Sequence, residues 1–150
     1  LDLSLQDLVP SATVVMPAEK PAKKQVRKKS GIVVIVNKSN SKTLSKTEIS
    51  NIYRDRITRW PTGERILVLN LPLDTAVRQR FSSTVLNMSP LDAATEYSNG
   101  MITNRLQNDY RTRNARIVVS YVERHENAIG YVPAESLSDT DNVRVAYTIP

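Results

Sequence analysis

The sequence predicts an α/β fold with a mixed β-sheet, because stretches of strand and helix character alternate along residues 31–150. Ile32–Val36 and Ile66–Leu69 are aliphatic runs of strand length, as expected for strands that helices cover on both faces. Each run is followed by a stretch whose apolar residues recur with helical spacing. This alternation is typical of a sheet with helices packed on its faces.

Three helices are predicted from start signals and periodicity. Ser45–Arg56 opens with a capping box completed by Glu48, and Asp74–Leu86 follows the second strand. Residues 89–101 begin with a serine followed by proline, a common helix start. The expected buried faces are Ile49, Ile52, Tyr53 and Ile57; Val77, Phe81 and Val85; and Leu91, Ala94, Tyr97 and Met101.

The last third of the sequence contains weaker signals. Residues 102–113 are polar and are expected to be irregular, whereas Ile117–Val122 fits either a strand or a helix. Ala128–Val132 is expected to form a short strand, and Val143–Ile149 alternates like a half-exposed edge strand. Trp60 is expected to anchor the core.

The net charge of +6 is unevenly distributed. Residues 1–30 hold six basic residues against three acidic ones, and Pro10–Ser30 lacks an amphipathic period. We therefore interpret residues 1–30 as a flexible, basic, proline-rich tether and residues 31–150 as the domain. A docking peptide that folds on a partner is the alternative for the first residues, where Leu1–Leu8 could form a strand or a short helix.

Several function classes are excluded by composition. The chain has no cysteine, which rules out disulfides and thiolate chemistry, and its single histidine, His125, cannot build a multi-histidine metal site. No apolar run is long enough to span a membrane. The chain starts with Leu and shows no signal peptide, so we expect a mature or trimmed product. No cofactor and no metal are predicted.

The strand, loop and helix at residues 66–86 form the first candidate site. Asp74 or Thr75 can cap the helix, and the remaining amides of such a helix start favour a negative group. A small anion is therefore a candidate ligand. The alternative is an ordinary capped helix after an ordinary strand.

Residues 31–81 contain, in order, a strand ending in Val-Asn, a Leu-Ser helix start, an Ile-Thr-x-Trp exit, a second strand and a loop before the next helix. This series of motifs resembles the phosphate ABC-transporter substrate-binding family of periplasmic proteins, in which that loop binds the ligand. The match continues at 86–90, at 97–98 and at 127–132. The resemblance implies a three-layer-like single lobe of a type 2 periplasmic binding protein, a helix at 115–126, a periplasmic location and no enzymatic activity.

Two departures from the family pattern affect the expected function. Family members are two-lobed and about twice as long, and this chain resembles only the later lobe. The family's loop Arg-x-x-Gly-Ser-Gly-Thr is also degenerate here, since its arginine position is Leu71 and only Thr75 retains a hydroxyl. The candidate ligand-binding residues are Asn70, Asp74, Thr75, Ala76, Val77 and Arg78. Because Asp74 places a like charge beside any phosphate, weak or no phosphate binding is expected.

The leading hypothesis is a non-enzymatic, substrate-binding-protein-like module that binds a protein partner in an envelope transport or receptor complex. A genuine small-anion binding protein is the alternative, and nucleic-acid binding through the basic segment is a lower one, because no recognition motif is evident. Catalysis is not favoured. His125 lies beside Glu123 and Glu126, but neighbouring residues on a helix point apart, and the end of the helix explains this histidine better.

Overall fold

The structure, a computed structural model, describes residues 31–150. The predictions for residues 1–30, including the flexible tether, lie outside the described residues.

A five-stranded sheet forms the centre of the domain. Its strands lie in the order β3-β2-β4-β1-β5; β2 is parallel to β3 and β4, whereas β1 is antiparallel to β4 and β5. The predicted mixed sheet is thus confirmed, with β5 as an edge strand. The strands are β1 (Ile32–Asn37), β2 (Leu67–Asn70), β3 (Asp109–Thr112), β4 (Ala128–Pro133) and β5 (Val143–Ile149).

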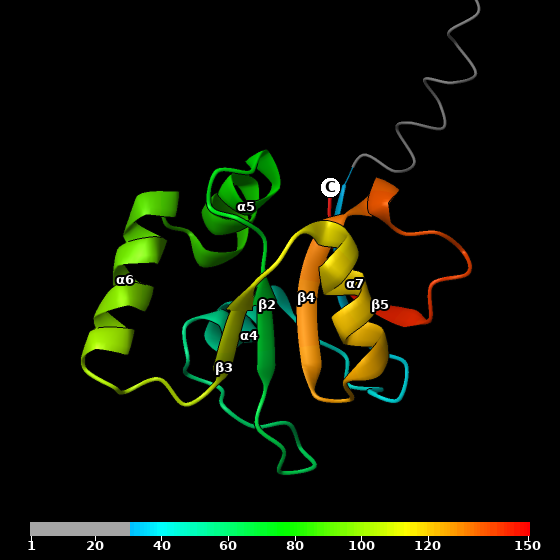
Figure 1. The fold of residues 1–150 in the computed structure, drawn as a ribbon, viewed down its shortest axis with the longest axis horizontal. Coiled ribbons are helices and arrows are strands. Elements are labelled where there is room, and N and C mark those ends of the chain that lie inside the picture. Colours follow the sequence, from blue (N-terminus) through cyan, green and yellow to red (C-terminus); the bar gives the residue numbers. More distant parts are fainter. Residues whose placement is uncertain (1–30) are drawn as a thin grey trace, which may run out of the picture.

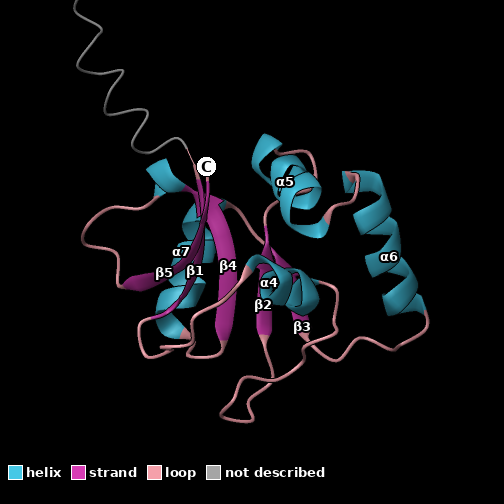
Figure 2. Ribbon diagram, turned by 180° about the vertical axis from the view of Figure 1, so that it is seen from behind, coloured by secondary structure: helices cyan, strands magenta, loops and turns pink. Residues whose placement is uncertain are grey.

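Helices cover both faces of this sheet, which gives three layers. Figure 1 shows α7 in front of β4 and β1, and Figure 2, from behind, shows α4 over the opposite face. The short α5 lies above the end of β2, and α6 lies outside the edge strand β3. The helical elements are α4 (Lys46–Tyr53), α5 (Ala76–Phe81), the π-helical turn η1 (Ser82–Leu86), α6 (Pro90–Ile102), α7 (Ala115–Arg124) and the 3₁₀ turn η2 (Ala134–Ser136).

Most local predictions are confirmed. The Ser45–Glu48 capping box forms, every residue of β1 is buried, and the ambiguous stretch Ile117–Val122 is helical, as the family resemblance implied. Trp60 is buried and its indole Nε1 donates to the carbonyl of Asn127 at 2.8 Å, so it does anchor the core.

Three predicted boundaries differ. The helix expected over Ser45–Arg56 ends at Tyr53, shortly before Asp55, whose φ of 63° is left-handed. The helix expected over Asp74–Leu86 consists of α5 and the π-helical turn η1, and it ends at Asn87, whose φ of 56° is left-handed. Residues 102–113 are not irregular throughout, because β3 forms at Asp109–Thr112. This strand has no apolar signature, since it lies at the exposed edge and is held by backbone pairing with β2.

The predicted inner face of α6 is confirmed only in part. Ala94 and Tyr97 are half-buried and Tyr97 contacts Tyr110, whereas Leu91 and Met101 are 72% and 57% exposed. The only buried residue of the helix is Gly100. A Cβ atom at Gly100 would lie 2.6 Å from Leu106, so the helix approaches the following loop through its smallest residue. Close backbone approach, rather than apolar periodicity, has set the rotation of α6.

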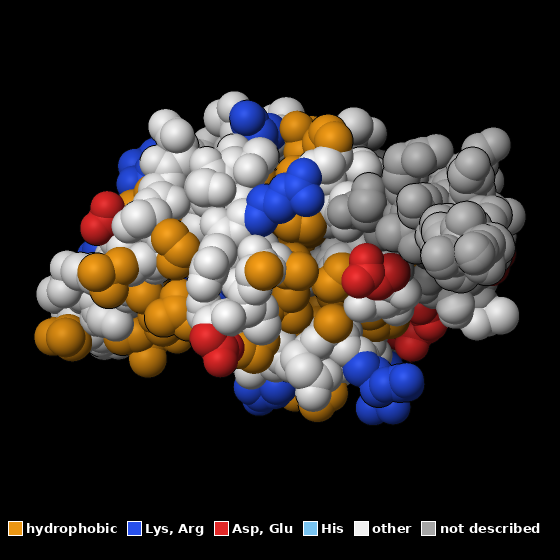
Figure 3. Space-filling model, turned by 90° about the horizontal axis from the view of Figure 1, so that it is seen from above, with side chains coloured by type: hydrophobic (Ala, Val, Ile, Leu, Met, Phe, Trp, Pro, Cys, Tyr) orange, Lys and Arg blue, Asp and Glu red, His pale blue; other side chains and the backbone are white. Residues whose placement is uncertain are grey.

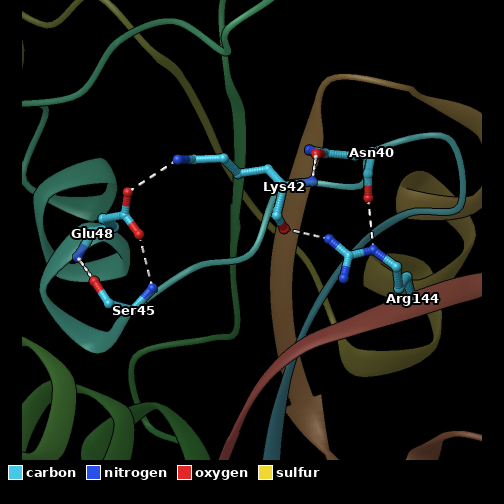
Figure 4. A network of polar contacts seen from close by, with 5 residues as sticks. All are labelled: Asn40, Lys42, Ser45, Glu48 and Arg144. Atoms are coloured by element: carbon cyan, nitrogen blue, oxygen red, sulfur yellow. Dashed lines mark hydrogen bonds and ion pairs between the residues drawn. The ribbon is translucent and has the colours of Figure 1, made fainter.

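An arginine of the edge strand fastens the loop between β1 and α4 (Figure 4). Arg144 Nε donates to the carbonyl of Asn40 at 2.7 Å, and a second guanidinium nitrogen donates to the carbonyl of Lys42. Lys42 in turn pairs with Glu48 at 3.2 Å, inside the capping box of α4. β5 is thereby connected to α4 through polar contacts as well as through the sheet.

Gly130 in β4 allows α7 to lie close to the sheet, and its substitution by alanine is expected to destabilise the domain. A Cβ at this position would lie 2.5 Å from Val118 Cγ1. We expect Gly130→Ala to lower the free energy of unfolding by about 1–3 kcal/mol, as overpacking does, in urea denaturation. In the double variant with Val118→Ala the losses should be clearly less than additive, because the smaller side chain removes the clash. Additive losses would contradict this explanation.

Candidate functional site

The carboxyl ends of β2, β3 and β4 lie at one edge of the sheet, here called the carboxyl edge. α5 begins after β2 and α7 begins after β3, so both helix starts lie at this edge (Figure 1). In open α/β sheets, ligands bind outside the carboxyl ends of the strands. The carboxyl edge is therefore the place to examine for a site, and it includes all six predicted residues.

Three aromatic rings support the loop between β2 and α5 from below. Phe81 stacks on Tyr131 of β4 with ring centroids 3.8 Å apart and planes 4° apart, and Tyr53 of α4 contacts Phe81 edge-on at 4.8 Å. All three rings are buried. Such aromatic pairs stabilise beyond the area they bury.

The hydroxyl groups of the two tyrosines bind the end of β2. Tyr53 donates to the carbonyl of Leu69 at 2.9 Å, and Tyr131 donates to Asn70 Oδ1 at 2.8 Å while accepting from the amide of Leu71 at 3.4 Å. Burial raises the pKa of both phenols, so they stay neutral and keep their protons as donors. The position of Asn70 is therefore fixed by β4.

Thr75, rather than Asp74, caps α5. The Thr75 hydroxyl accepts from the amide of Arg78 at 3.3 Å and donates to the carbonyl of Pro72 at 2.7 Å. Asp74 is exposed and Ala76 is exposed beside it. The one hydroxyl that the ligand loop retains is thus already engaged in the local turn.

Arg78 is turned back toward the protein. Its Nη1 donates to the carbonyl of Leu71 at 3.0 Å, and the residue is half-buried, as is Val77. Within residues 31–150, Arg78 forms no ion pair with a carboxylate. The six predicted residues are contiguous, yet their polar groups do not converge on one point outside the helix start. Anion binding by these residues stays a prediction.

Sequence reasoning missed the residues that position this loop. Tyr53 and Tyr131 lie 16 and 61 residues from Leu69 and Asn70, the β2 residues that they bind, and only the fold brings them together. The sequence offered one local signal of a polar group inside this region. Ser82 is a polar residue close to Phe81 and Val85, which are predicted to face the core, and it is 1% exposed.

His125 has the helix-end role predicted for it. It follows the last turn of α7, its amide donates to the carbonyl of Tyr121, and its Nδ1 lies 3.0 Å from the same oxygen. No ion pair joins it to Glu123 or Glu126 in the described part of the chain. An acid-base pair is therefore not assembled around it.

Apolar side chains are exposed at the carboxyl edge. Leu73 in the β2–α5 loop is 43% exposed, and Ile117 in the first turn of α7 is 39% exposed. Figure 3 looks onto this edge and shows hydrophobic side chains across its middle, with basic and acidic side chains beside them. A surface with an apolar centre and a charged rim is typical of protein interfaces.

Helix α6 forms one side of this edge and is fastened by an ion pair. Arg54 at the end of α4 donates from Nε and Nη2 to the two carboxylate oxygens of Glu96, at 3.0 and 2.8 Å. These hydrogen bonds hold the pKa of the Glu96 carboxyl below its usual range and raise that of Arg54. The pair is bidentate, the geometry in which such contacts are strongest.

Residues 31–150 contain no group of three His, Asp or Glu side chains that could hold a metal ion. None of the helices in this part of the chain has the length and apolar character needed to cross a membrane.

The geometry defines a class of protein: an α/β lobe in which two helices begin at the carboxyl ends of parallel strands. The model of the PBP superfamily domain matches residues 17–148, and the chain therefore belongs to the PBP superfamily. This match includes 17–30, ahead of the described domain. Comparison with curated proteins finds no match.

Two solved structures are similar to this chain. An ABC-type phosphate transport receptor from Vibrio cholerae superposes with a TM-score of 0.58 and 18% identity over 77% of this chain and 44% of the receptor. A possible phosphate binding protein from Planctomyces limnophilus gives a TM-score of 0.49 and 16% identity over 80% and 44% of the two chains. The chain thus spans less than half the length of either protein. The predicted single-lobe fold of a type 2 periplasmic binding protein is confirmed.

We expect Glu96→Gln to destabilise the protein by about 1 kcal/mol at pH 7, because it removes a partly exposed bidentate ion pair. The pKa of Glu96 is lowered by folding, so the stabilisation is fully present above the ordinary carboxyl pKa of about 4.3. It is lost as the pH falls through the folded-state pKa. Urea denaturation from pH 7 to pH 3 should show the two proteins converging at low pH.

The matched control is Glu64→Gln, an exposed acid of the turn before β2. It should leave the free energy of unfolding within about 0.5 kcal/mol of the wild type at every pH. A Glu96→Gln deficit that persists at pH 3 would show that packing of the side chain, not its charge, holds α6.

Proposed function

We propose that this chain is a non-enzymatic binding-protein-like module of the cell envelope, located in the periplasm, that recognises a protein partner through its carboxyl edge. One combined observation carries this proposal. The polar groups of the ligand loop already form hydrogen bonds within the protein, while an apolar surface directly beside the loop is exposed. The module would act as an accessory component of a transport or receptor complex.

The hydrogen bonds and charges of the ligand loop argue against a tight anion-binding site of the kind that a transport protein needs. The Thr75 hydroxyl satisfies its own turn, Arg78 donates to a backbone carbonyl, and Asp74 adds a negative charge at the helix start. An anion placed there would lack the charge-assisted hydrogen bonds that make such sites tight.

Exposed apolar side chains at the carboxyl edge support the same conclusion. This edge is one wall of the described lobe (Figure 1). The exposed Leu73 and Ile117 lie on that wall and leave apolar area available for a protein surface. Burying this area would contribute the hydrophobic part of the binding free energy.

The basic segment before the domain fits this proposal as a connection to the partner. A charged segment beside a docking surface raises the effective concentration of the second contact. Its attraction for an acidic partner would weaken with salt.

The partner interface is tested by placing a charge at its centre. We expect Leu73→Asp to reduce recovery of the partner chain by tenfold or more when the tagged protein is purified from its native envelope, because a buried unpaired carboxylate is costly. The partner chain is the protein that co-purifies with the wild type and is identified by mass spectrometry. Its band on a gel is the reference for the variants.

Leu91→Asp is the matched control, since Leu91 is an exposed leucine on the outer face of α6. It should leave recovery of the same band unchanged. Equal loss in both variants would point to general instability, and unchanged recovery with Leu73→Asp would place the interface elsewhere.

Phosphate binding tests the state of the ligand loop. Because two or three charge-assisted contacts are absent, the affinity should be weaker than micromolar, and isothermal titration calorimetry with inorganic phosphate should show no saturable heat in the micromolar range. Asp74→Gly with Ala76→Gly approximates the family loop and should strengthen any residual binding. Tight binding by the wild type would refute the degenerate-loop proposal.

A further inference from the structure

A small cavity lies under the carboxyl edge, between α6 and the side of α5 and η1. Its volume is about 40 Å³, and its polar lining comes from Asn70, Arg78, Ser82, Tyr97 and Thr112. The other lining residues are apolar, or are Tyr53 and Tyr110, whose hydroxyls donate to backbone carbonyls of Leu69 and Ile52. We call this space the Arg78 cavity.

The Arg78 cavity contains a positive charge and no negative one. Arg78 is half-buried, one of its nitrogens donates to the carbonyl of Leu71, and no Asp or Glu is among the lining residues. A partly desolvated guanidinium is stabilised by an anion that accepts its remaining N–H groups. The cavity therefore favours a ligand with negative charge.

Ser82 supplies a second, independent indication. The residue is 1% exposed and is among the residues that line the cavity. Ser82 lies four residues after Arg78, which places both side chains on the same side of the helix. A serine hydroxyl in the lining of a polar cavity can bind a ligand.

Asn70 is oriented as a donor. Its Oδ1 accepts the hydroxyl proton of Tyr131 at 2.8 Å, and Tyr131 itself accepts from the amide of Leu71. This chain of hydrogen bonds fixes which end of the Asn70 amide is oxygen and leaves Nδ2 free to donate. The cavity thus combines a guanidinium, an amide N–H₂ and a serine hydroxyl.

The size of the cavity limits the ligand group. The cavity volume of about 40 Å³ exceeds the about 10–15 Å³ that one water molecule needs, so the cavity can hold a small polar group. A carboxylate carries a single charge and pairs with a single guanidinium. A phosphate carries more charge, which one guanidinium matches less well.

We propose that the Arg78 cavity is a binding site for a carboxylate group, held by Arg78, Ser82 and Asn70 on the side of the helix that faces α6. This site differs from the start of α5, whose capping groups are not used. It does not depend on the protein-partner proposal, because the carboxylate could belong to a small molecule or to a polypeptide terminus.

The test is a titration of the full chain with sodium acetate, followed by ¹H–¹⁵N spectra of backbone amides and of the Arg78 and Asn70 side chains. Sodium chloride at the same ionic strength is the reference. We expect saturable shifts confined to the residues around the cavity with acetate, and no saturable shifts there with chloride or inorganic phosphate. Shifts spread over the surface arginines, or saturation by phosphate instead of acetate, would overturn the proposal.

Ser82→Ala provides the decisive variant, because it removes one donor while changing the volume little. Loss of a hydrogen bond to a charged group should weaken acetate binding about tenfold. Ser83→Ala is the matched control, since Ser83 is exposed and its hydroxyl bonds to the carbonyl of Arg80; its affinity should equal that of the wild type. Equal affinities in all three proteins would refute the assignment.

Two further probes distinguish the source of the carboxylate. N-acetyl-triglycine carries a free terminal carboxylate, and its terminal amide is the uncharged control. Binding of the acid form but not the amide would identify a polypeptide terminus as an acceptable ligand, whereas binding of acetate alone would assign the site to small carboxylates. Equal binding of acid and amide would overturn the proposal, since charge would then play no part.

Discussion

The contact between Phe81 and Tyr131 is the interaction on which the carboxyl edge depends. It joins the first helix after β2 to the neighbouring strand β4, and the hydroxyl of Tyr131 then fixes Asn70 and Leu71 at the end of β2. Together with the Tyr53 hydroxyl, which binds the carbonyl of Leu69, this stack positions the loop that carries Thr75 relative to the sheet. The three buried rings stabilise this part of the structure. The two hydrogen-bonded tyrosine hydroxyls make its geometry specific.

This arrangement separates the polar groups near α5 into two sets. Thr75 and one nitrogen of Arg78 are consumed by the turn itself, which leaves the start of the helix poor in free donors. Ser82, Asn70 and Arg78 line the small cavity between α6 and the side of α5 and η1. The groups near α5 that are not used by the turn are therefore found beside the helix and not at its start.

Helix α6 is the least tightly attached element at this edge. It buries one glycine, exposes its large apolar residues, and is held through Tyr97, which contacts Tyr110 edge-on, and through the Arg54–Glu96 pair. Elements with few buried apolar contacts open at lower free-energy cost than the core. A helix of this kind beside a small cavity can adjust to what the cavity holds.

The sequence by itself determined the layers of this protein, because that information is local. Strand-length aliphatic runs, the Ser45–Glu48 capping box and the motif order over residues 31–81 predict the elements and the family without any tertiary contact. The tertiary structure decided the rotation of α6, the pairing of the polar strand β3, and the use of each group near α5. The rotation of α6 depends on the close approach of Gly100 to Leu106, and β3 depends on backbone pairing with β2. The hydrogen bonds near α5 depend on Tyr53 and Tyr131, which bind β2 from distant positions in the sequence. Such contacts join residues far apart in the chain, so neither hydrophobic periodicity nor a local motif could contain them.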